Sequence, residues 1–207
     1  MLRGHDLATG YAAVLVASVI IVFAQPHGVA SRLVLASSTN TQNLRTQPLL
    51  VLFVSAFVVS SPWGLWILPF LVWGFGAAQR WLGRAATVLV AAFGHVFATV
   101  FVGVLINAGI AHHQLSRSIA REPDVGASYA LAALVGVMVF RLTPAARGKV
   151  SVVVTAGLTG HLVLSQTFTE LGHVVAWVIG LTMGFVGSRI AGARYATGRG
   201  AFREPVG

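Results

Sequence analysis

Six long apolar runs, separated by polar or basic segments, decide what this chain can fold into. The runs lie at about 8–24, 49–79, 85–111, 126–143, 149–168 and 171–191, and breaks in the second run lead us to assign its transmembrane helix to 62–82. An α-helix needs about 20 apolar residues to cross the hydrocarbon core of a bilayer, and these runs reach or approach that length. We therefore predict an all-α, polytopic membrane protein in which residues 1–207 form one domain with six transmembrane helices.

The composition supports a membrane protein and excludes several other classes. Hydrophobic residues make up 56% of the 207 positions and charged residues only 9%, whereas soluble domains have roughly 25% charged residues. The absence of cysteine excludes disulfides, thiolate nucleophiles and zinc–thiolate sites. The net charge is +9, but the basic residues concentrate between apolar runs, which is typical of topology signals rather than nucleic-acid binding. We expect contact with membrane lipid, and neither a metal nor a cofactor.

The segment between the first two predicted helices is long and partly polar. It covers residues 25–61, and we expect it to form an external loop that contains a horizontal or partly inserted helix near 47–60. Two prolines follow this helix. Pro62 suits the first turn of the second transmembrane helix, whereas Pro69 is expected to kink it.

Basic residues are unevenly divided between the two ends of the predicted helices. Ten of the 14 lie near the N-terminus, in the turns at 80–84 and 141–149, and from Arg189 through a basic tail at 192–207. Four lie in the loops on the opposite side. The positive-inside rule therefore predicts a multi-pass plasma-membrane protein with both termini in the cytoplasm.

Small residues form a stripe along the last predicted helix, because they recur at every fourth position and residues four apart share a helix face. These residues are Gly172, Ala176, Gly180 and Gly184. The fourth predicted helix carries a similar stripe made of Ser128, Ala132 and Gly136. Smooth stripes allow two membrane helices to approach closely, so we predict that these two helices pack together along them.

Ser128 and His173 lie within about one turn of the outer ends of their predicted helices, and therefore at the same depth. A serine hydroxyl becomes a nucleophile when a base within hydrogen-bond reach takes its proton, and an ionisable residue in a membrane helix is a functional candidate. Gly126 would let the backbone approach a substrate, and amides at a helix start can stabilise an oxyanion. The alternative interpretation is structural, with Ser128 and Gly126 as packing residues and His173 as a hydrogen-bonded interhelical histidine.

The order of these residues resembles that of the rhomboid family. One helix opens with Gly126-Ala127-Ser128, and the last helix carries the pattern His173-x-x-Ala176-x-x-x-Gly180. The segments 48–57 and 76–84 are similar to the sequences on either side of the family's second helix, so the resemblance covers about residues 10–190. The chain resembles in particular the divergent rhomboid-like proteins of actinobacteria.

The resemblance implies a bundle of six transmembrane helices and an intramembrane serine protease with a Ser–His dyad. Ser128 would be the nucleophile and His173 the general base, with oxyanion support from the backbone of Gly126, Ala127 and Tyr129. The expected substrates are transmembrane proteins, cleaved near the outer face of the membrane. The alternative, from a different class, is a catalytically silent rhomboid-like protein that binds transmembrane clients.

Three features depart from the family pattern. Tyr129 stands where the family's Gly-x-Ser-Gly motif ends in glycine, and Gln79 stands where the family often has glutamate. Trp63 and Ile67 occupy the second-helix positions at which the family carries His and Asn side chains that assist the oxyanion. Loss of one such donor typically costs about 10²–10³ in rate. The chain thus keeps the nucleophile and the base without the usual side-chain oxyanion support.

Four further polar residues have structural interpretations. We expect Asp124 to cap the fourth helix rather than to orient groups at its start, and Glu170 either to cap the last helix or to hydrogen-bond near His173. His95 and His161 lie inside apolar runs and are expected to make polar contacts between helices. A small transporter or channel is a weaker hypothesis, because the sequence places no carboxylate in the middle of a predicted helix.

Overall fold

The structure is a computed structural model that describes residues 6–200, with side chains described as far as residue 191. Within that range the chain forms α-helices and short 3₁₀ helices (η), and no strand. The elements in order are α1 (Asp6–Phe23), α2 (His27–Ser37), α3 (Thr41–Thr46), α4 (Pro48–Val54), η1 (Ser55–Phe57), η2 (Pro62–Ile67), α5 (Leu68–Leu82), α6 (Arg84–Ala111), η3 (Arg117–Arg121), α7 (Ala127–Met138), η4 (Val139–Arg141), α8 (Pro144–Ser165) and α9 (Phe168–Gly200). The predicted basic tail at 192–207 lies outside the residues whose side chains are described.

Four helices are long and apolar enough to cross a membrane by length and composition, namely α1, α6, α8 and the part of α9 up to Ala191. A further candidate is the bent pair Pro48–Phe57 and Pro62–Leu82, whose two parts meet at 70°. The fourth predicted span corresponds to a shorter apolar helix, Ala127–Arg141, which extends only about 22 Å at 1.5 Å per residue. The described residues therefore contain four or five candidate spans, compared with the six that the apolar runs predict.

The two prolines of the second predicted span both lie at helix starts. Pro62 begins η2, and Pro69 falls in the first turn of α5. The expected kink inside a continuous helix is therefore replaced by a change from 3₁₀ to α-helix at Leu68. Proline lacks a backbone N–H, but an N–H in the first turn of a helix has no intrahelical acceptor. Pro69 therefore removes no hydrogen bond from α5.

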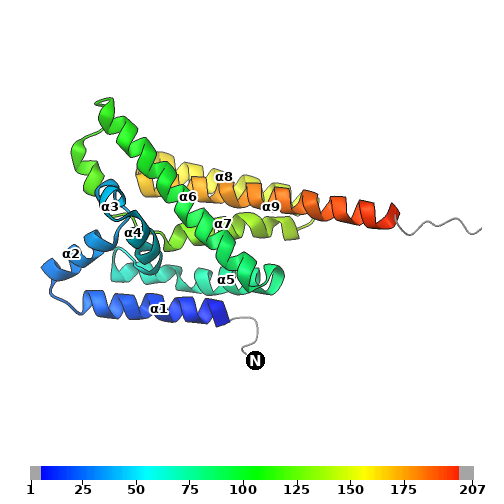
Figure 1. The fold of residues 1–207 in the computed structure, drawn as a ribbon, viewed down its shortest axis with the longest axis horizontal. Helices are drawn as coiled ribbons and strands as arrows, with labels where there is room; N and C mark the ends of the chain where they lie inside the picture. Colours follow the sequence, from blue (N-terminus) through cyan, green and yellow to red (C-terminus); the bar gives the residue numbers. More distant parts are fainter. Residues whose placement is uncertain (1–5, 201–207) are drawn as a thin grey trace, which may run out of the picture.

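Helix α7 lies inside the bundle (Figure 1). It packs against α9, α6 and α5, and the side chains of Ala133 and Leu134 in its middle are fully buried. Helix α6 crosses the other long helices obliquely, while α2, α3 and α4 gather together at one end of the bundle. Helix α8 lies beside α9 on the outside and has no buried residue.

The small-residue stripes of α7 and α9 face each other. An ideal Cβ placed on Gly180 would lie 2.1 Å from the carbonyl oxygen of Ala133, and one on Gly136 would lie 2.7 Å from the carbonyl oxygen of Trp177. One turn further along, a Cβ on Gly184 would meet the Phe140 ring at 2.4 Å. The two helices thus touch backbone to backbone, which only glycine permits at such contacts.

Gln79 joins the first helix to the second predicted span. Its buried side chain accepts a hydrogen bond from the Leu7 amide at 3.1 Å and donates one to the Asp6 carboxylate. The same carboxylate forms an ion pair with Arg84 at the start of α6. The position at which the family often has glutamate therefore fastens the starts of α1 and α6 to the end of α5.

Candidate active site

Ser128 and His173 lie side by side at the same end of α7 and α9. Ser128 is in the first turn of α7, His173 is in the second turn of α9, and Ser128 Oγ lies 2.7 Å from His173 Nε2. The backbone contact between Gly180 and Ala133 further along the two helices brings them close enough for this hydrogen bond. A serine and an imidazole at this distance have the geometry in which the ring can accept the hydroxyl proton.

Glu170 lies behind His173, one helical turn earlier on α9. Its Oε2 is 3.0 Å from His173 Nδ1 and 2.9 Å from His161 Nδ1 on α8. The Glu170 and His173 side chains are only 16% and 17% exposed, whereas that of His161 is 62% exposed. The Thr167 hydroxyl caps α9 by accepting from the Glu170 amide at 3.3 Å. The Glu170 side chain therefore takes the second of its two expected roles, contact with His173.

Tyr129 packs its ring against that of His173. The two rings meet edge to face, with centroids 5.2 Å apart, and Tyr129 is fully buried. A Cβ on Gly172 would lie 2.2 Å from Cζ of the Tyr129 ring. Gly172 thus makes room for Tyr129, which stands at the position of the family's glycine. The Tyr129 ring in turn restricts the movement of the His173 ring.

Asp124 joins three segments at the entrance to α7. Its carboxylate accepts hydrogen bonds from the hydroxyls of Tyr129, Thr169 and Thr39 at 2.9, 3.3 and 3.4 Å. The cap residue of α7 is Gly126, with no side-chain cap hydrogen bond, so the prediction that Asp124 caps this helix is wrong. Burial raises the pKa of Asp124, and the hydrogen bonds from Tyr129 and Thr169 act in the opposite direction.

The segment before Ser128 contacts α6 and η1. The Gly126 amide donates to the Ser55 carbonyl at 3.1 Å, and Gly126 packs against the buried His95 ring. His95 Nε2 lies 2.8 Å from the Leu52 carbonyl oxygen and 3.2 Å from Ser55 Oγ. His95 thus makes the expected polar contact between segments, here between α6 and the α4–η1 turn.

A cleft of about 740 Å³ opens beside the Ser128–His173 pair. It is bounded by η2 and α5 on one side and by α7, α8 and α9 on the others, and Glu170 and His161 also line it. Ile67 contributes an apolar side chain to this lining, while Trp63 is 86% exposed. The rhomboid resemblance places oxyanion donors at these two positions. Neither position supplies a polar side chain comparable to His or Asn.

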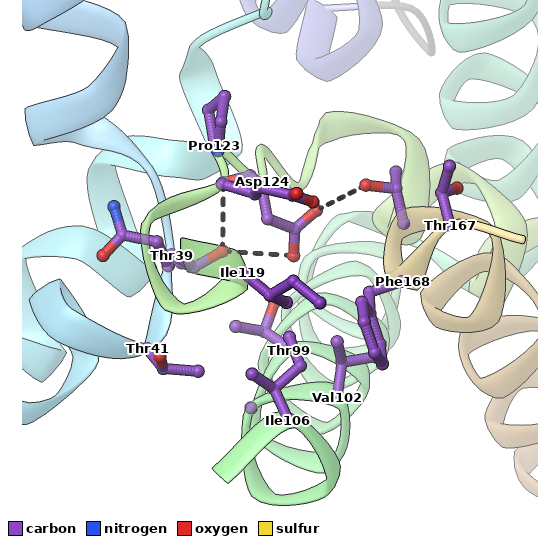
Figure 2. Close-up of a pocket in the computed structure, with 14 residues that line it drawn as sticks. Thr39, Thr41, Thr99, Val102, Ile106, Ile119, Pro123, Asp124, Thr167 and Phe168 are labelled. Atoms are coloured by element: carbon purple, nitrogen blue, oxygen red, sulfur yellow. Dashed lines mark hydrogen bonds between the residues drawn. The ribbon is translucent and has the colours of Figure 1, made fainter. Parts of the chain in front are cut away.

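A second, smaller cavity of about 300 Å³ has Asp124 in its lining (Figure 2). Thr39 and Asp124 face each other there, and Thr99, Val102 and Ile106 of α6 line one wall. Among the described residues, no group of three or more His, Cys, Asp or Glu side chains is arranged to hold a metal ion.

A family model described as rhomboid-like protein matches residues 8–189. The chain therefore belongs to the rhomboid-like protein family, which confirms the resemblance noted in the sequence. The match and the apolar helices together identify a rhomboid-like membrane protein. Neither the curated proteins nor the solved structures contain a match to the chain.

The sequence predicts the contact of Glu170 with His173 and a polar interhelical contact for His161, but not that His161 shares the Glu170 carboxylate with His173. The spacing of Glu170 and His173, three residues apart, is a signal for contact on one helix face. His161 carries no comparable signal, because it comes from a different helix and its approach depends on how α8 packs on α9.

Proposed function

We propose that this protein is an intramembrane serine protease in which Ser128 is the nucleophile and His173 the general base. The observation that carries the proposal is the 2.7 Å contact between Ser128 Oγ and His173 Nε2 at the wall of an open cleft. A buried packing serine would need no such cleft, and an interhelical structural histidine would need no hydroxyl partner at the cleft wall.

The reaction follows from the positions of these atoms. As Ser128 Oγ attacks the carbonyl carbon of a substrate peptide bond, its proton passes to His173 Nε2. Collapse of the tetrahedral intermediate breaks the C–N bond, and Nε2 returns the proton to the leaving amine. Water then attacks the ester on Ser128, with His173 again taking and returning the proton. This restores the free hydroxyl and releases the acid product.

The first turn of α7 supplies the oxyanion support in this proposal. The first N–H groups of a helix have no intrahelical acceptors and carry the positive end of the helix dipole. Ala127 and Ser128 are in that turn, and Ala127 lines the cleft. Backbone amides would thus replace the side-chain donors that Trp63 and Ile67 lack, in the segment held by Gly126.

The proposed membrane arrangement has six spans: α1, η2–α5, α6, α7–η4, α8 and the first part of α9. The protein would lie in the plasma membrane. Both termini would be in the cytoplasm, as the distribution of basic residues indicates. Ser128 and His173 would then lie near the outer face. A transmembrane substrate would reach them between α5 and α8, since both helices border the cleft.

The second candidate function is a catalytically silent protein that binds transmembrane clients. Ile67 at the cleft wall and the exposed Trp63 favour it, because an apolar lining suits an apolar client better than it suits an oxyanion. Under this alternative the same cleft would hold the client without cutting it.

Covalent labelling separates the two functions without knowledge of the substrate. Purified protein in detergent is treated with a fluorescent fluorophosphonate, which reacts with activated serines. We expect labelling of the wild type and of Ser31→Ala, an exposed serine on α2, and none of Ser128→Ala. An unlabelled wild type, or labelling that persists in Ser128→Ala, would exclude the protease and leave the client-binding function.

A further inference from the structure

We infer that Glu170 is a positioning residue that completes a Ser128–His173–Glu170 triad, where the resemblance implies only a Ser–His dyad. This inference rests on the proposed function. It is carried by a continuous line of contacts: Ser128 Oγ is 2.7 Å from His173 Nε2, and His173 Nδ1 is 3.0 Å from Glu170 Oε2. Nucleophile, base and orienting carboxylate therefore follow one another in the order of a Ser–His–Glu triad.

The carboxylate determines which nitrogen of His173 carries the proton. An ionised carboxylate only accepts hydrogen bonds, so the contact with Glu170 requires the proton on His173 Nδ1. The lone pair of a neutral His173 ring is then on Nε2, where it faces the hydroxyl of Ser128. With the other tautomer, Nε2–H would point at the serine and the ring could not accept its proton.

The carboxylate also balances the charge that appears during the reaction. When Nε2 takes the proton of Ser128, His173 becomes an imidazolium next to a Glu170 that is 16% exposed. A negative charge in direct hydrogen-bonding contact stabilises that cation, more strongly because little water competes for it. The Tyr129 ring also contacts His173 edge to face, which helps to keep the imidazole aligned with both partners.

His161 offers a competing, purely structural explanation for Glu170. The same Oε2 atom lies 2.9 Å from His161 Nδ1, so Glu170 also ties α8 to α9. Helix α8 has no buried residue, and among the side chains that the structure describes it makes one other hydrogen bond to α9, from Trp177 Nε1 to Thr155 Oγ1 at 3.0 Å. If Glu170 served only as this tie, removing His161 and removing the carboxylate would have equal consequences.

The test compares Glu170→Gln with His161→Ala by the rate of fluorophosphonate labelling at saturating probe. His161→Ala breaks the tie to α8 but leaves Glu170 against His173. We expect it to slow labelling by less than about fivefold, as for other exposed ion pairs. Glu170→Gln keeps the size of the side chain and removes its charge, and we expect labelling at least about 10²-fold slower, since loss of a triad carboxylate costs up to about 10⁴.

Thermal melting of each variant separates chemistry from folding. If Glu170→Gln does not melt cooperatively, Glu170→Asp replaces it. That variant withdraws the carboxylate by more than 1 Å, and we expect labelling slowed by roughly 10²-fold. Labelling of a folded Glu170 variant at the wild-type rate, or slowing equal to that of His161→Ala, would overturn the inference alone. An unlabelled wild type would overturn the proposed function together with the inference.

Discussion

The Cα of Gly126 packs directly against the imidazole of His95, so that an ideal Cβ on Gly126 would be 1.8 Å from both Cε1 and Nδ1 of the ring. The ring is buried and held by the Leu52 carbonyl oxygen at 2.8 Å. We expect Gly126→Ala to lower the free energy of unfolding by roughly 1–3 kcal/mol through overpacking. Ser128, two residues later, should also label more slowly with a fluorophosphonate.

Thermal melting in detergent and labelling rates measure these two effects. The matched control is Gly157→Ala on α8, where a new Cβ meets nothing within 4 Å, and this protein should melt at or above the wild-type temperature. A Gly126→Ala protein that melts and labels like the wild type would show that His95 has room to move.

The contact of Gly180 with Ala133 predicts a large difference between two glycines of the same helix. Because a Cβ on Gly180 would lie 2.1 Å from a backbone oxygen, Gly180→Ala must push α9 away from α7, at a cost of roughly 1–3 kcal/mol or more. Gly187→Ala, where nothing lies within 4 Å, should be neutral or stabilising by up to about 1 kcal/mol. Equal melting temperatures for the two variants would mean that the seam between α7 and α9 is elsewhere.

Asp124 makes stability depend on pH. Burial raises its pKa above the ordinary value of 3.8, so the folded protein keeps this proton to a higher pH than the unfolded chain does. Unfolding then releases a proton, and a rise in pH between the ordinary and the raised pKa favours unfolding. We expect the melting temperature to fall as pH rises through this window, and Asp124→Asn to remove that part of the slope.

Tyr129→Phe should strengthen the pH dependence that Asp124→Asn removes. It removes the hydroxyl that donates to Asp124 at 2.9 Å, which should raise the pKa of Asp124 further and extend the fall in melting temperature to higher pH. At neutral pH we expect a loss of roughly 1.5–3 kcal/mol, as for hydrogen bonds to charged groups. Melting curves that match those of the wild type at every pH would argue against the Asp124–Tyr129 contact.

Cleavage of a co-expressed transmembrane protein would test Ser128 and His173 as one unit. Groups that act together in a mechanism are strongly non-additive. We expect Ser128→Ala and His173→Ala each to abolish cleavage, and the double variant to be little worse than either. Additive losses measured on immunoblots would indicate that the two residues act separately.

The proposed orientation makes a prediction that does not depend on catalysis. A reporter that is active only in the cytoplasm, fused after Gly207, should be active, and the same reporter inserted between residues 112 and 125 should be silent. The reverse pattern would invert the topology and place Ser128 at the cytoplasmic face.

Much of the site could be predicted because its signals are periodic. Glycine and alanine at every fourth position indicate a helix face regardless of the rest of the fold, and Gly136 and Gly180 do lie at backbone contacts. The spacing of residues along α7 and α9 also indicated that Ser128 and His173 lie at equal depth, which is compatible with the hydrogen bond between them.

Features that depend on contacts between distant segments could not be predicted in this way. Asp124 has the sequence position of a helix cap, but the hydroxyls of Thr39 and Thr169, from two other segments, compete for its carboxylate. The approach of His161 to Glu170 similarly depends on how α8 packs. Pro69 predicted a kink because the sequence does not reveal that 3₁₀ geometry precedes it.

The absence of any fully buried residue in α8 has a consequence for how its sequence can vary. The helix from Pro144 to Ser165 has no buried residue. Its side chains are therefore selected mainly for compatibility with the lipid around the bundle, rather than for tight packing against other helices. Most of its apolar positions should therefore accept exchanges among Leu, Ile, Val and Phe. Thr155 and His161, which reach Trp177 and Glu170 on α9, should change least among homologues, because each makes a polar contact that an apolar side chain would lose.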